Sequence, residues 1–455
     1  MPIGYALVRG LVRFLLGIFY RRIEVVGAER VPRDGPLILT PNHHNSIVDA
    51  MLLLAVVPRR LRTLANAPLF RHPLIGPFLR LVGALPVHRR QEAGDDPARN
   101  AALFAATTAT LRAGDAILIF PEGRTQPEPV LLTLRTGAAR MLLAAEAAGG
   151  GPRPVTLLPV GLVYREPGTF RTGWALVLVG LPVPSEDCVA LARTAPEQAA
   201  RTLTDRLADA LRRQIIEADD RQTLRLLGMV EAVWREETGA VPADETTRIA
   251  WLQRVMRAYR SLLDRDPERV AAVRRQLETY AKELELAGLE SAQLSRAYPP
   301  GVVARFALRE GGSLLFGAPL ALWGIAVHFV PYQLTGAVVR YLRRTAEEEA
   351  TDKIAAGLIL YPLAWAAEAW GVLRLGGTWA LAGFLASLLP AGFFALAWRE
   401  RLDRVRREAR AFARFLGDRD LHRRLRERRR VLATELEALV RLVPDAWVEP
   451  ATRDR

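Results

Sequence analysis

The sequence predicts an α/β domain, with a mixed sheet flanked by helices, followed by a helical connector and hydrophobic, membrane-inserted C-terminal helices. Three observations predict this fold class. Short apolar runs alternate with amphipathic stretches from about residue 35 to 185, residues 221–299 are polar and helix-prone, and long uncharged stretches follow residue 310. Alternating strand and helix patterns are typical of α/β layers. About 20 apolar residues are enough to cross the hydrocarbon core of a bilayer.

Length and composition allow two or three domains with large cores, since the chain has 455 residues and 50% of them are hydrophobic. The single cysteine, Cys188, excludes an intrachain disulfide, and no Cys/His cluster has the spacing of metal ligands. We therefore expect a reducing compartment, no metal site and no cofactor.

The net charge of +14 comes almost wholly from arginine, and the total alone gives little support to nucleic-acid binding, which we do not predict. The position of the charge is more informative. Residues 399–430 hold 14 arginines against six acidic residues, directly after a long apolar run. Such a cluster suits anionic lipid headgroups and is typical of the cytoplasmic flank of a membrane segment.

The first segment, residues 1–29, predicts an interfacial amphipathic helix. Arg9 and Arg13 lie one helical step apart. The residues available for an apolar face are Leu7, Val8, Leu11, Val12, Leu15 and Phe19. A helix packed on the domain is the alternative. A signal peptide is disfavoured because the two arginines interrupt any apolar core and no small-residue cleavage site follows.

Residues 30–220 contain the α/β pattern. Strands are predicted at 36–40, 83–87, 116–120, 155–164 and 174–183, and helices at 46–56, 97–113 and 135–148. After Pro184 a helix is predicted from leucines and an isoleucine that repeat every four residues, at Leu203, Leu207, Leu211 and Ile215. Polar clusters follow three of the strands, where ligands gather in such sheets.

The remainder of the chain predicts a helical connector (221–300), hydrophobic membrane segments (301–398) and an arginine-rich helical tail (399–455). Residues 311–339 and 375–398 carry no charge, and 354–373 carry one, at Glu368. The sequence Arg374-Leu375-Gly376-Gly377 predicts the turn of a helical hairpin. A buried, soluble helical domain is the alternative.

The stretch "LTPNHHNSIVDA" (39–50) follows the first predicted strand. Ser46 and Asp49 have the spacing of a capping box, so the stretch alone predicts the start of a helix. If the helix begins there, His44 lies on the loop and Asp49 in the first turn, close enough to pair. An Asp that accepts from one ring nitrogen raises the basicity of the other, as a general base requires.

Two further polar clusters end strands. "LIFPEGRT" places Pro121, Glu122, Gly123 and Arg124 after one strand, and "GALPVHRR" places Arg89 and Arg90 after another. Each alone is a turn with solvated charges. The three clusters together are more specific, because they follow one another along the chain as NHHNS, HRR and PEGRT, with a predicted helix between the last two. A serine esterase is disfavoured because the sequence lacks Gly-x-Ser-x-Gly.

With these clusters, residues 30–185 resemble the phospholipid/glycerol acyltransferase family, which includes glycerol-3-phosphate and 1-acylglycerol-3-phosphate O-acyltransferases. The family signature is matched by Asn42-His43-His44 to Asp49, Gly83 to Arg89, Phe120 to Gly123, and Leu158 to Gly161. "GPLILTPNHHNSIVDA" and "LRTGAAR" look like the longer members that carry hydrophobic C-terminal segments and act on glycerol 3-phosphate or dihydroxyacetone phosphate.

The resemblance implies roles for individual residues. His44 would deprotonate the acceptor hydroxyl and Asp49 would orient His44. Arg89 would hold the acceptor phosphate, and Glu122 and Gly123 would shape the acceptor site. Many members read Phe-Pro-Glu-Gly-Thr-Arg, whereas Arg124 and Thr125 stand in reversed order here, so a contact between Arg124 and the phosphate is left open.

The function expected from this resemblance is that of a membrane-bound O-acyltransferase in phospholipid synthesis. Its donor would be acyl-CoA or acyl-carrier protein, and its acceptor glycerol 3-phosphate or lysophosphatidate. The expected location is the bacterial inner membrane, among membrane lipids, with the catalytic domain on the cytoplasmic side. The alternative is a non-catalytic lipid-binding membrane protein that retains the fold. The spacing of His44 and Asp49 favours the enzyme.

Overall fold

The computed structural model describes the chain in two compact units. The first is Met1–Asp220 with Arg344–Ile354, and the second is Arg221–Arg343 with Ala355–Arg455. The residues described are 2–73, 75–87, 97–126, 128–149, 153–165, 170–171, 173–242, 244–296, 299–342, 345 and 348–444.

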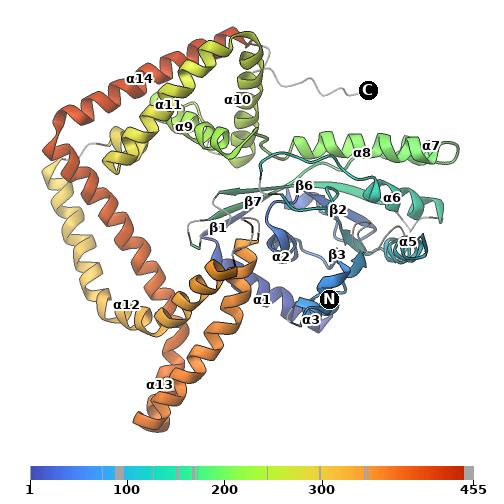
Figure 1. The fold of residues 1–455 in the computed structure, drawn as a ribbon, viewed down its shortest axis with the longest axis horizontal. Helices are drawn as coiled ribbons and strands as arrows, with labels where there is room; N and C mark the ends of the chain where they lie inside the picture. Colours follow the sequence, from blue (N-terminus) through green and yellow to red (C-terminus); the bar gives the residue numbers. More distant parts are fainter. Residues whose placement is uncertain are drawn as a thin grey trace. The chain divides into compact units, whose positions relative to one another are not determined.

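The first unit is built on a seven-stranded sheet with the order β1-β7-β6-β2-β5-β3-β4 (Figure 1). Only β6 and β7 pair antiparallel, so the sheet is mixed, as predicted. Two strands were not predicted, β1 and β3, because both are short and carry arginine among their apolar residues. The strands are β1 (Arg22–Val26), β2 (Leu37–Pro41), β3 (Leu61–Asn66), β4 (Leu85–Val87), β5 (Ala116–Leu118), β6 (Thr156–Arg165) and β7 (Trp174–Val179).

Helices cover both faces of this sheet. Leu37 and Leu39 of β2 belong to one core and Ile38 to the other, as the alternation of side chains along a strand requires. The first face packs against α1 (Ile3–Phe19), α2 (Ser46–Val56) and α3 (Ile75–Val82). The second packs against α5 (Pro97–Arg112), α6 (Gly137–Ala147), α7 (Glu186–Leu191) and α8 (Pro196–Arg212). Short 3-10 turns lie at η1 (Ala28–Arg30) and η2 (Ala67–Arg71).

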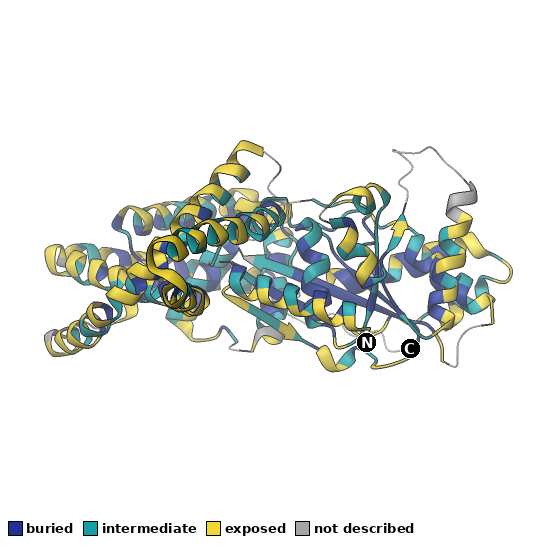
Figure 2. Cartoon of the chain, turned by 90° about the horizontal axis from the view of Figure 1, so that it is seen from below, coloured by how far each residue is buried: buried dark blue, intermediate teal, exposed yellow. Residues whose placement is uncertain are grey.

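Burial follows this arrangement of helices on both faces of the sheet, and the buried strands are dark blue in Figure 2. The predicted helix after Pro184 is present as α7 and α8, and the four residues predicted for its buried stripe all lie in the second core: Leu203, Leu207, Leu211 and Ile215. Ala350, from the returning segment Arg344–Ile354, lies in the first core.

Helix α1 supports the end of α2. The Arg9 guanidinium donates to Val57 O at 2.7 Å and Arg13 Nε donates to Ala55 O at 2.8 Å, so both side chains bind carbonyls at the carboxyl end of α2. A cation at this end also compensates the helix dipole. Residues Ile3, Leu7 and Phe14 stay exposed on the other side of α1, at 81%, 70% and 42%.

The second unit is helical throughout its described residues. Four helices and a 3-10 turn pack together: α9 (Arg221–Thr238), α10 (Glu245–Arg265), α11 (Pro267–Ala287), η3 (Ser291–Ser295) and α14 (Arg419–Leu442). The buried guanidinium of Arg429 links three of them, because it donates to Glu237 at 2.5 Å, to Ser291 O at 2.7 Å and to the Ser295 hydroxyl at 2.9 Å.

The predicted apolar stretches form α12 (Pro300–Leu342) and α13 (Glu349–Gly417). Both are long and apolar enough to cross a membrane, and little of their apolar surface is buried. Helix α12 runs through Pro319 and Pro331 without a break. Helix α13 has a non-helical residue, Gly377, with φ of 73°, at the predicted turn. Trp365 before it packs against Phe384 and Leu388 after it, which confirms the hairpin.

Candidate active site

Asn42 fixes the chain directly after β2. Its side-chain amide donates to Leu162 O at 2.9 Å, and its oxygen accepts from Leu162 N at 2.6 Å. These two bonds continue the pairing of β2 with β6 by one residue beyond Pro41, and Asn42 is fully buried. The next residue, His43, therefore leaves the sheet from a rigid anchor.

Asp49 gathers the loop that follows. Its carboxylate is fully buried, and Oδ2 accepts from His43 Nδ1 at 2.8 Å and from the backbone N–H of His44 and Asn45 at 2.9 and 2.8 Å. A carboxylate next to Nδ1 assigns the ring proton of His43 to that nitrogen. This leaves Nε2 as a hydrogen-bond acceptor.

The predicted pairing of the His44 ring with Asp49 is wrong. His44 gives Asp49 its backbone N–H, and its ring Nδ1 lies 3.0 Å from Gln126 O. The predicted start of α2 is confirmed, but Asn45, not Ser46, is the N-cap residue and it makes no side-chain cap bond. Ser46 has a φ of +46°, in the left-handed region, and this turn brings His43 rather than His44 to Asp49.

Tyr164, at the end of β6, binds the other oxygen of Asp49. Its hydroxyl donates to Oδ1 at 2.5 Å. Burial and the neighbouring carboxylate raise the pKa of Tyr164 well above its ordinary value, so the phenol stays a proton donor. Tyr20 accepts from the Asn45 amide at 2.7 Å and its pKa is raised by burial and by Asp49. Neither tyrosine was predicted, and only the place of Tyr164 at a strand end hinted at it.

Glu122 connects the turn after β5 to the histidine loop. Its Oε1 accepts from His43 N at 2.8 Å and its Oε2 from Leu132 N at 3.2 Å, while the Phe120 ring stacks on the His43 ring at 3.9 Å. The side chain is 3% exposed. Burial raises the pKa of Glu122 to about 7, although the two backbone donors act in the opposite direction.

Gly123 has a φ of +72°, and a Cβ placed on it would lie 2.6 Å from Arg135 Nε. Arg124 is exposed and makes no side-chain hydrogen bond or ion pair within the described residues. That its guanidinium binds phosphate stays a prediction. Arg89 lies outside the described residues; the strand before it, β4, ends at Val87, three strands from β2.

Thr125 completes the surroundings of His43. Its Oγ1 lies 3.0 Å from His43 Nε2, and the next residue, Gln126, donates its N–H to His43 O at 3.1 Å. Asp49, His43 and Thr125 are thus connected by hydrogen bonds from a buried carboxylate to a hydroxyl. Sequence reasoning missed Thr125; its only signal was the reversed order of Arg124 and Thr125.

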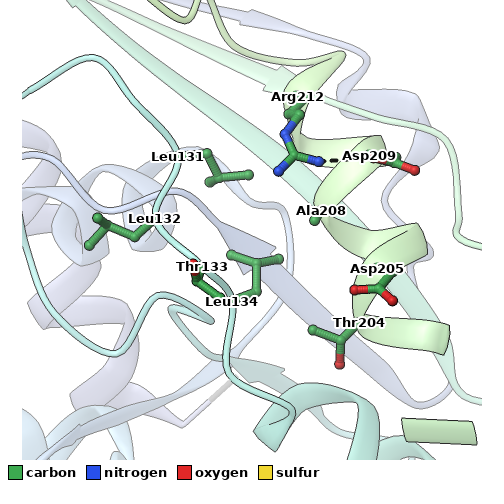
Figure 3. A pocket seen from close by; sticks show the side chains of 9 residues that line it. All are labelled: Leu131, Leu132, Thr133, Leu134, Thr204, Asp205, Ala208, Asp209 and Arg212. Carbon is green, nitrogen blue, oxygen red and sulfur yellow. Dashed lines mark hydrogen bonds and ion pairs between the residues drawn. The ribbon is translucent and has the colours of Figure 1, made fainter. Parts of the chain in front are cut away.

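A cavity of about 360 Å³ lies on the second face of the first unit (Figure 3). The segment 131–134 and one side of α8 line it, and none of the residues described above as contacting His43 does. Leu132, whose N–H binds Glu122, belongs to both regions. The lining residues are Leu131, Leu132, Thr133, Leu134, Thr204, Asp205, Ala208, Asp209 and Arg212.

Part of the chain is similar in sequence to known acyltransferases. Residues 22–163 match the family model described as Acyltransferase. An uncharacterized acyltransferase of Schizosaccharomyces pombe is 24% identical over 48% of this chain and 45% of its own length. The human 1-acyl-sn-glycerol-3-phosphate acyltransferase alpha is 25% identical over 38% of this chain and 58% of its own length. The Bacillus subtilis 1-acyl-sn-glycerol-3-phosphate acyltransferase is 24% identical over 36% of this chain and 75% of its own length.

Among solved structures, the 1-acyl-sn-glycerophosphate (LPA) acyltransferase PlsC of Thermotoga maritima is 17% identical. It covers 46% of this chain and 78% of its own, with a TM-score of 0.34. The chain spans about half the length of the S. pombe and human relatives that it matches.

Proposed function

We propose that the chain, whose residues 22–163 match the Acyltransferase family model, transfers a fatty acyl group from an acyl thioester to a hydroxyl of glycerol 3-phosphate or lysophosphatidate. The donor would be acyl-CoA or acyl-carrier protein. The observation that carries the proposal is the pairing of His43 Nδ1 with the buried Asp49 carboxylate at 2.8 Å. That pairing leaves Nε2 to accept a proton.

In the proposed reaction, His43 Nε2 takes the proton of the acceptor hydroxyl as its oxygen attacks the thioester carbonyl carbon. Asp49 stabilises the imidazolium that forms. The carbon–sulfur bond then breaks, and His43 returns the proton to the leaving thiolate, so that an ester and a thiol are released. General-base catalysis of this kind contributes on the order of 10²- to 10⁴-fold in rate.

For the acceptor phosphate we propose Arg89. Parallel strands are about 4.8 Å apart, so the carboxyl end of β4 lies about 14 Å from that of β2. A long arginine side chain and a glycerol phosphate together can cover such a distance. A guanidinium binds phosphate through two parallel hydrogen bonds. Arg124, exposed beside Glu122, is the second cation available to the same ligand.

The proposed place of action is the cytoplasmic face of a bacterial inner membrane. Helices α12 and α13 support insertion by their length and apolar composition. The exposed Ile3, Leu7 and Phe14 of α1 support contact of that helix with the membrane interface. The arginines of 399–430 suit anionic headgroups on the same side.

The test is an acyl-transfer assay on the full-length protein purified in detergent. Palmitoyl-CoA and palmitoyl-acyl-carrier protein are offered as donors to glycerol 3-phosphate, dihydroxyacetone phosphate, lysophosphatidate and lysophosphatidylcholine. We expect ester formation with a phosphate monoester acceptor. A protein that bound these lipids and transferred to none would instead be a non-catalytic lipid-binding protein that keeps the fold.

A further inference from the structure

The hydroxyl of Thr125 stands where the proposed reaction needs the acceptor hydroxyl. Its Oγ1 is 3.0 Å from His43 Nε2, the nitrogen that faces away from Asp49. With the ring proton on Nδ1, Nε2 has one lone pair in the ring plane and accepts one hydrogen bond. Thr125 and a substrate hydroxyl therefore cannot both donate to this nitrogen.

The backbone on both sides of Thr125 is held in place. His43 N donates to Glu122 Oε1 at 2.8 Å, Gln126 N donates to His43 O at 3.1 Å, and the His44 ring lies 3.0 Å from Gln126 O. These contacts tie the turn of residues 122–126 to the loop that carries His43. The simplest movement that releases Nε2 is rotation of the Thr125 side chain about χ1, which has three staggered positions.

A water molecule and an acceptor alcohol differ in what they gain by displacing this hydroxyl. When water displaces Thr125, one hydrogen bond to His43 Nε2 replaces another, so water gains no net free energy. An acceptor that also binds through its phosphate can use that remote binding free energy to displace the threonine. The contact thus favours the acceptor over water at the base.

On this geometry, and resting on the function proposed above, we propose that Thr125 caps the base of the free enzyme and suppresses hydrolysis of the acyl donor. The suppressed reaction is the attack of water on the thioester carbonyl carbon, with its proton passed to Nε2. The carbon–sulfur bond breaks, the thiolate takes the proton from Nε2, and a fatty acid and a thiol are released. Thr125 is a positioning residue in this account, not a nucleophile.

The experiment measures two rates on the full-length protein with palmitoyl-CoA: thiol release without acceptor, and ester formation with the acceptor that the wild type uses. The ratio of hydrolysis to transfer does not depend on the fraction of protein that is folded. Thr125→Ala removes the hydroxyl and opens space for water, and we expect the ratio to rise about three- to tenfold, the range of one net hydrogen bond. Thr125→Ser keeps the hydroxyl and should keep the wild-type ratio.

Two further variants separate the cap from other roles. Thr125→Val fills the space with a methyl group, so water stays excluded and the ratio should stay low. The double variant Thr125→Ala with His43→Ala should lose the added hydrolysis, because the base is gone. Thr133→Ala is the matched control, since this exposed threonine lines the cavity of Figure 3 and makes no contact with His43.

An unchanged ratio in Thr125→Ala would overturn the proposal. So would a fall of transfer in both Thr125→Ala and Thr125→Val to the level of His43→Ala, because the hydroxyl would then be needed for the chemistry itself. A wild type that transfers to no acceptor contradicts the proposed function instead, so the two failures are distinguishable.

Discussion

Asp49 determines which histidine is placed for chemistry. Its buried carboxylate accepts from the His43 ring, from two backbone N–H groups and from the Tyr164 hydroxyl. A charge removed from water needs such partners to remain ionised. The same partners hold the loop in one conformation. The carboxylate therefore orients the His43 ring and also fixes the two residues, His44 and Asn45, that lead into α2.

Glu122 predicts a pH dependence of stability. Burial raises its pKa from 4.5 to about 7 in the folded protein, so the folded state binds a proton more tightly than the unfolded state does. The contribution of Glu122 to the free energy of unfolding is then fully present below pH 4.5 and is lost as the pH rises through 7. Its upper bound is about 3 kcal/mol.

The measurement is chemical denaturation of the detergent-purified protein between pH 4.5 and 8. We expect Glu122→Gln to lose stability less steeply with rising pH than the wild type does, because an amide has no proton to lose in this range. An equal slope in both proteins would show that Glu122 is ionised throughout this range.

Gly123→Ala should lower the free energy of unfolding for two separable reasons, an unfavourable backbone angle and a steric clash. An alanine there has an unfavourable φ of +72° and a Cβ 2.6 Å from Arg135 Nε. Gly149 is a matched control, because its φ is +95° and a Cβ would contact nothing within 4 Å. We expect Gly149→Ala to lose about 1 kcal/mol of unfolding free energy and Gly123→Ala to lose more. Adding Arg135→Ala should return Gly123→Ala to the level of the control; no return would mean that Arg135 is not the obstacle.

The sequence predicted the clusters of the site better than the contacts within them. Asp49, Glu122 and the start of α2 follow from apolar runs and capping patterns. The choice of His43 over His44 depends on the left-handed φ of Ser46, and no residue pattern marks a serine for that conformation. Thr125 reaches His43 only because two loops 82 residues apart are bonded together.

At the scale of elements, α12 and the second half of α13 pack closely through small residues. A Cβ on Gly324 would clash with Ala391 O, and one on Gly317 would lie 3.0 Å from the Phe394 ring. Trp323 Nε1 donates to the Ser387 hydroxyl at 3.0 Å beside this contact. Small residues at such a crossing let two apolar helices approach without a hydrophobic driving force between them.

This packing predicts opposite effects for two Gly→Ala changes in α12. Gly336→Ala adds a methyl group where nothing lies within 4 Å, so the better helix propensity of alanine should stabilise by up to about 1 kcal/mol. Gly324→Ala forces the helices apart and should destabilise by about 1 to 3 kcal/mol. Thermal unfolding in detergent compares them, and the same sign for both would contradict the packing described.

Strands with both faces covered were predicted from their continuous apolar runs. Strands that partly face solvent were missed. The runs that became β2, β5, β6 and β7 are almost wholly apolar because both faces of these strands are covered. β1 and β3 carry arginines, since part of each faces solvent. Period-2 alternation over five or six residues with charged members gives too weak a pattern to separate a strand from a loop.

At the scale of the whole molecule, the course of the chain limits how α12 can cross a membrane. The first unit contains Met1–Asp220, which precedes the polar helices before α12, and Arg344–Ile354, which follows α12, and Ala350 is buried in its core. A single crossing by α12 would place these parts on opposite sides. We therefore expect α12 to enter and leave the bilayer on one side, as its curved course in Figure 1 and its two prolines allow.

Cysteine labelling in sealed vesicles tests this topology, with Cys188→Ala as background. Single cysteines replace four exposed residues, at Leu181, Tyr341, Leu375 and Leu416. We expect the Leu181, Tyr341 and Leu416 positions to react from the cytoplasmic face and the turn at Leu375 from the other. If the cysteine at position 341 reacted only from the side on which the cysteine at position 375 reacts, α12 would cross the membrane once. If the cysteine at position 416 reacted only from that side, the arginine-rich tail would lie opposite the predicted cytoplasmic face.

The central claim is that His43, paired with Asp49, is the base of an acyltransferase. Initial rates of acyl transfer to the preferred acceptor test it most directly, measured for the wild type, His43→Ala and His44→Ala at equal amounts of folded protein. We predict that His43→Ala lowers kcat by on the order of 10²- to 10⁴-fold, while His44→Ala, which leaves the hydrogen bond between the His43 ring and Asp49 in place, lowers it far less. Near-normal turnover in His43→Ala, with the large loss in His44→Ala, would contradict the account.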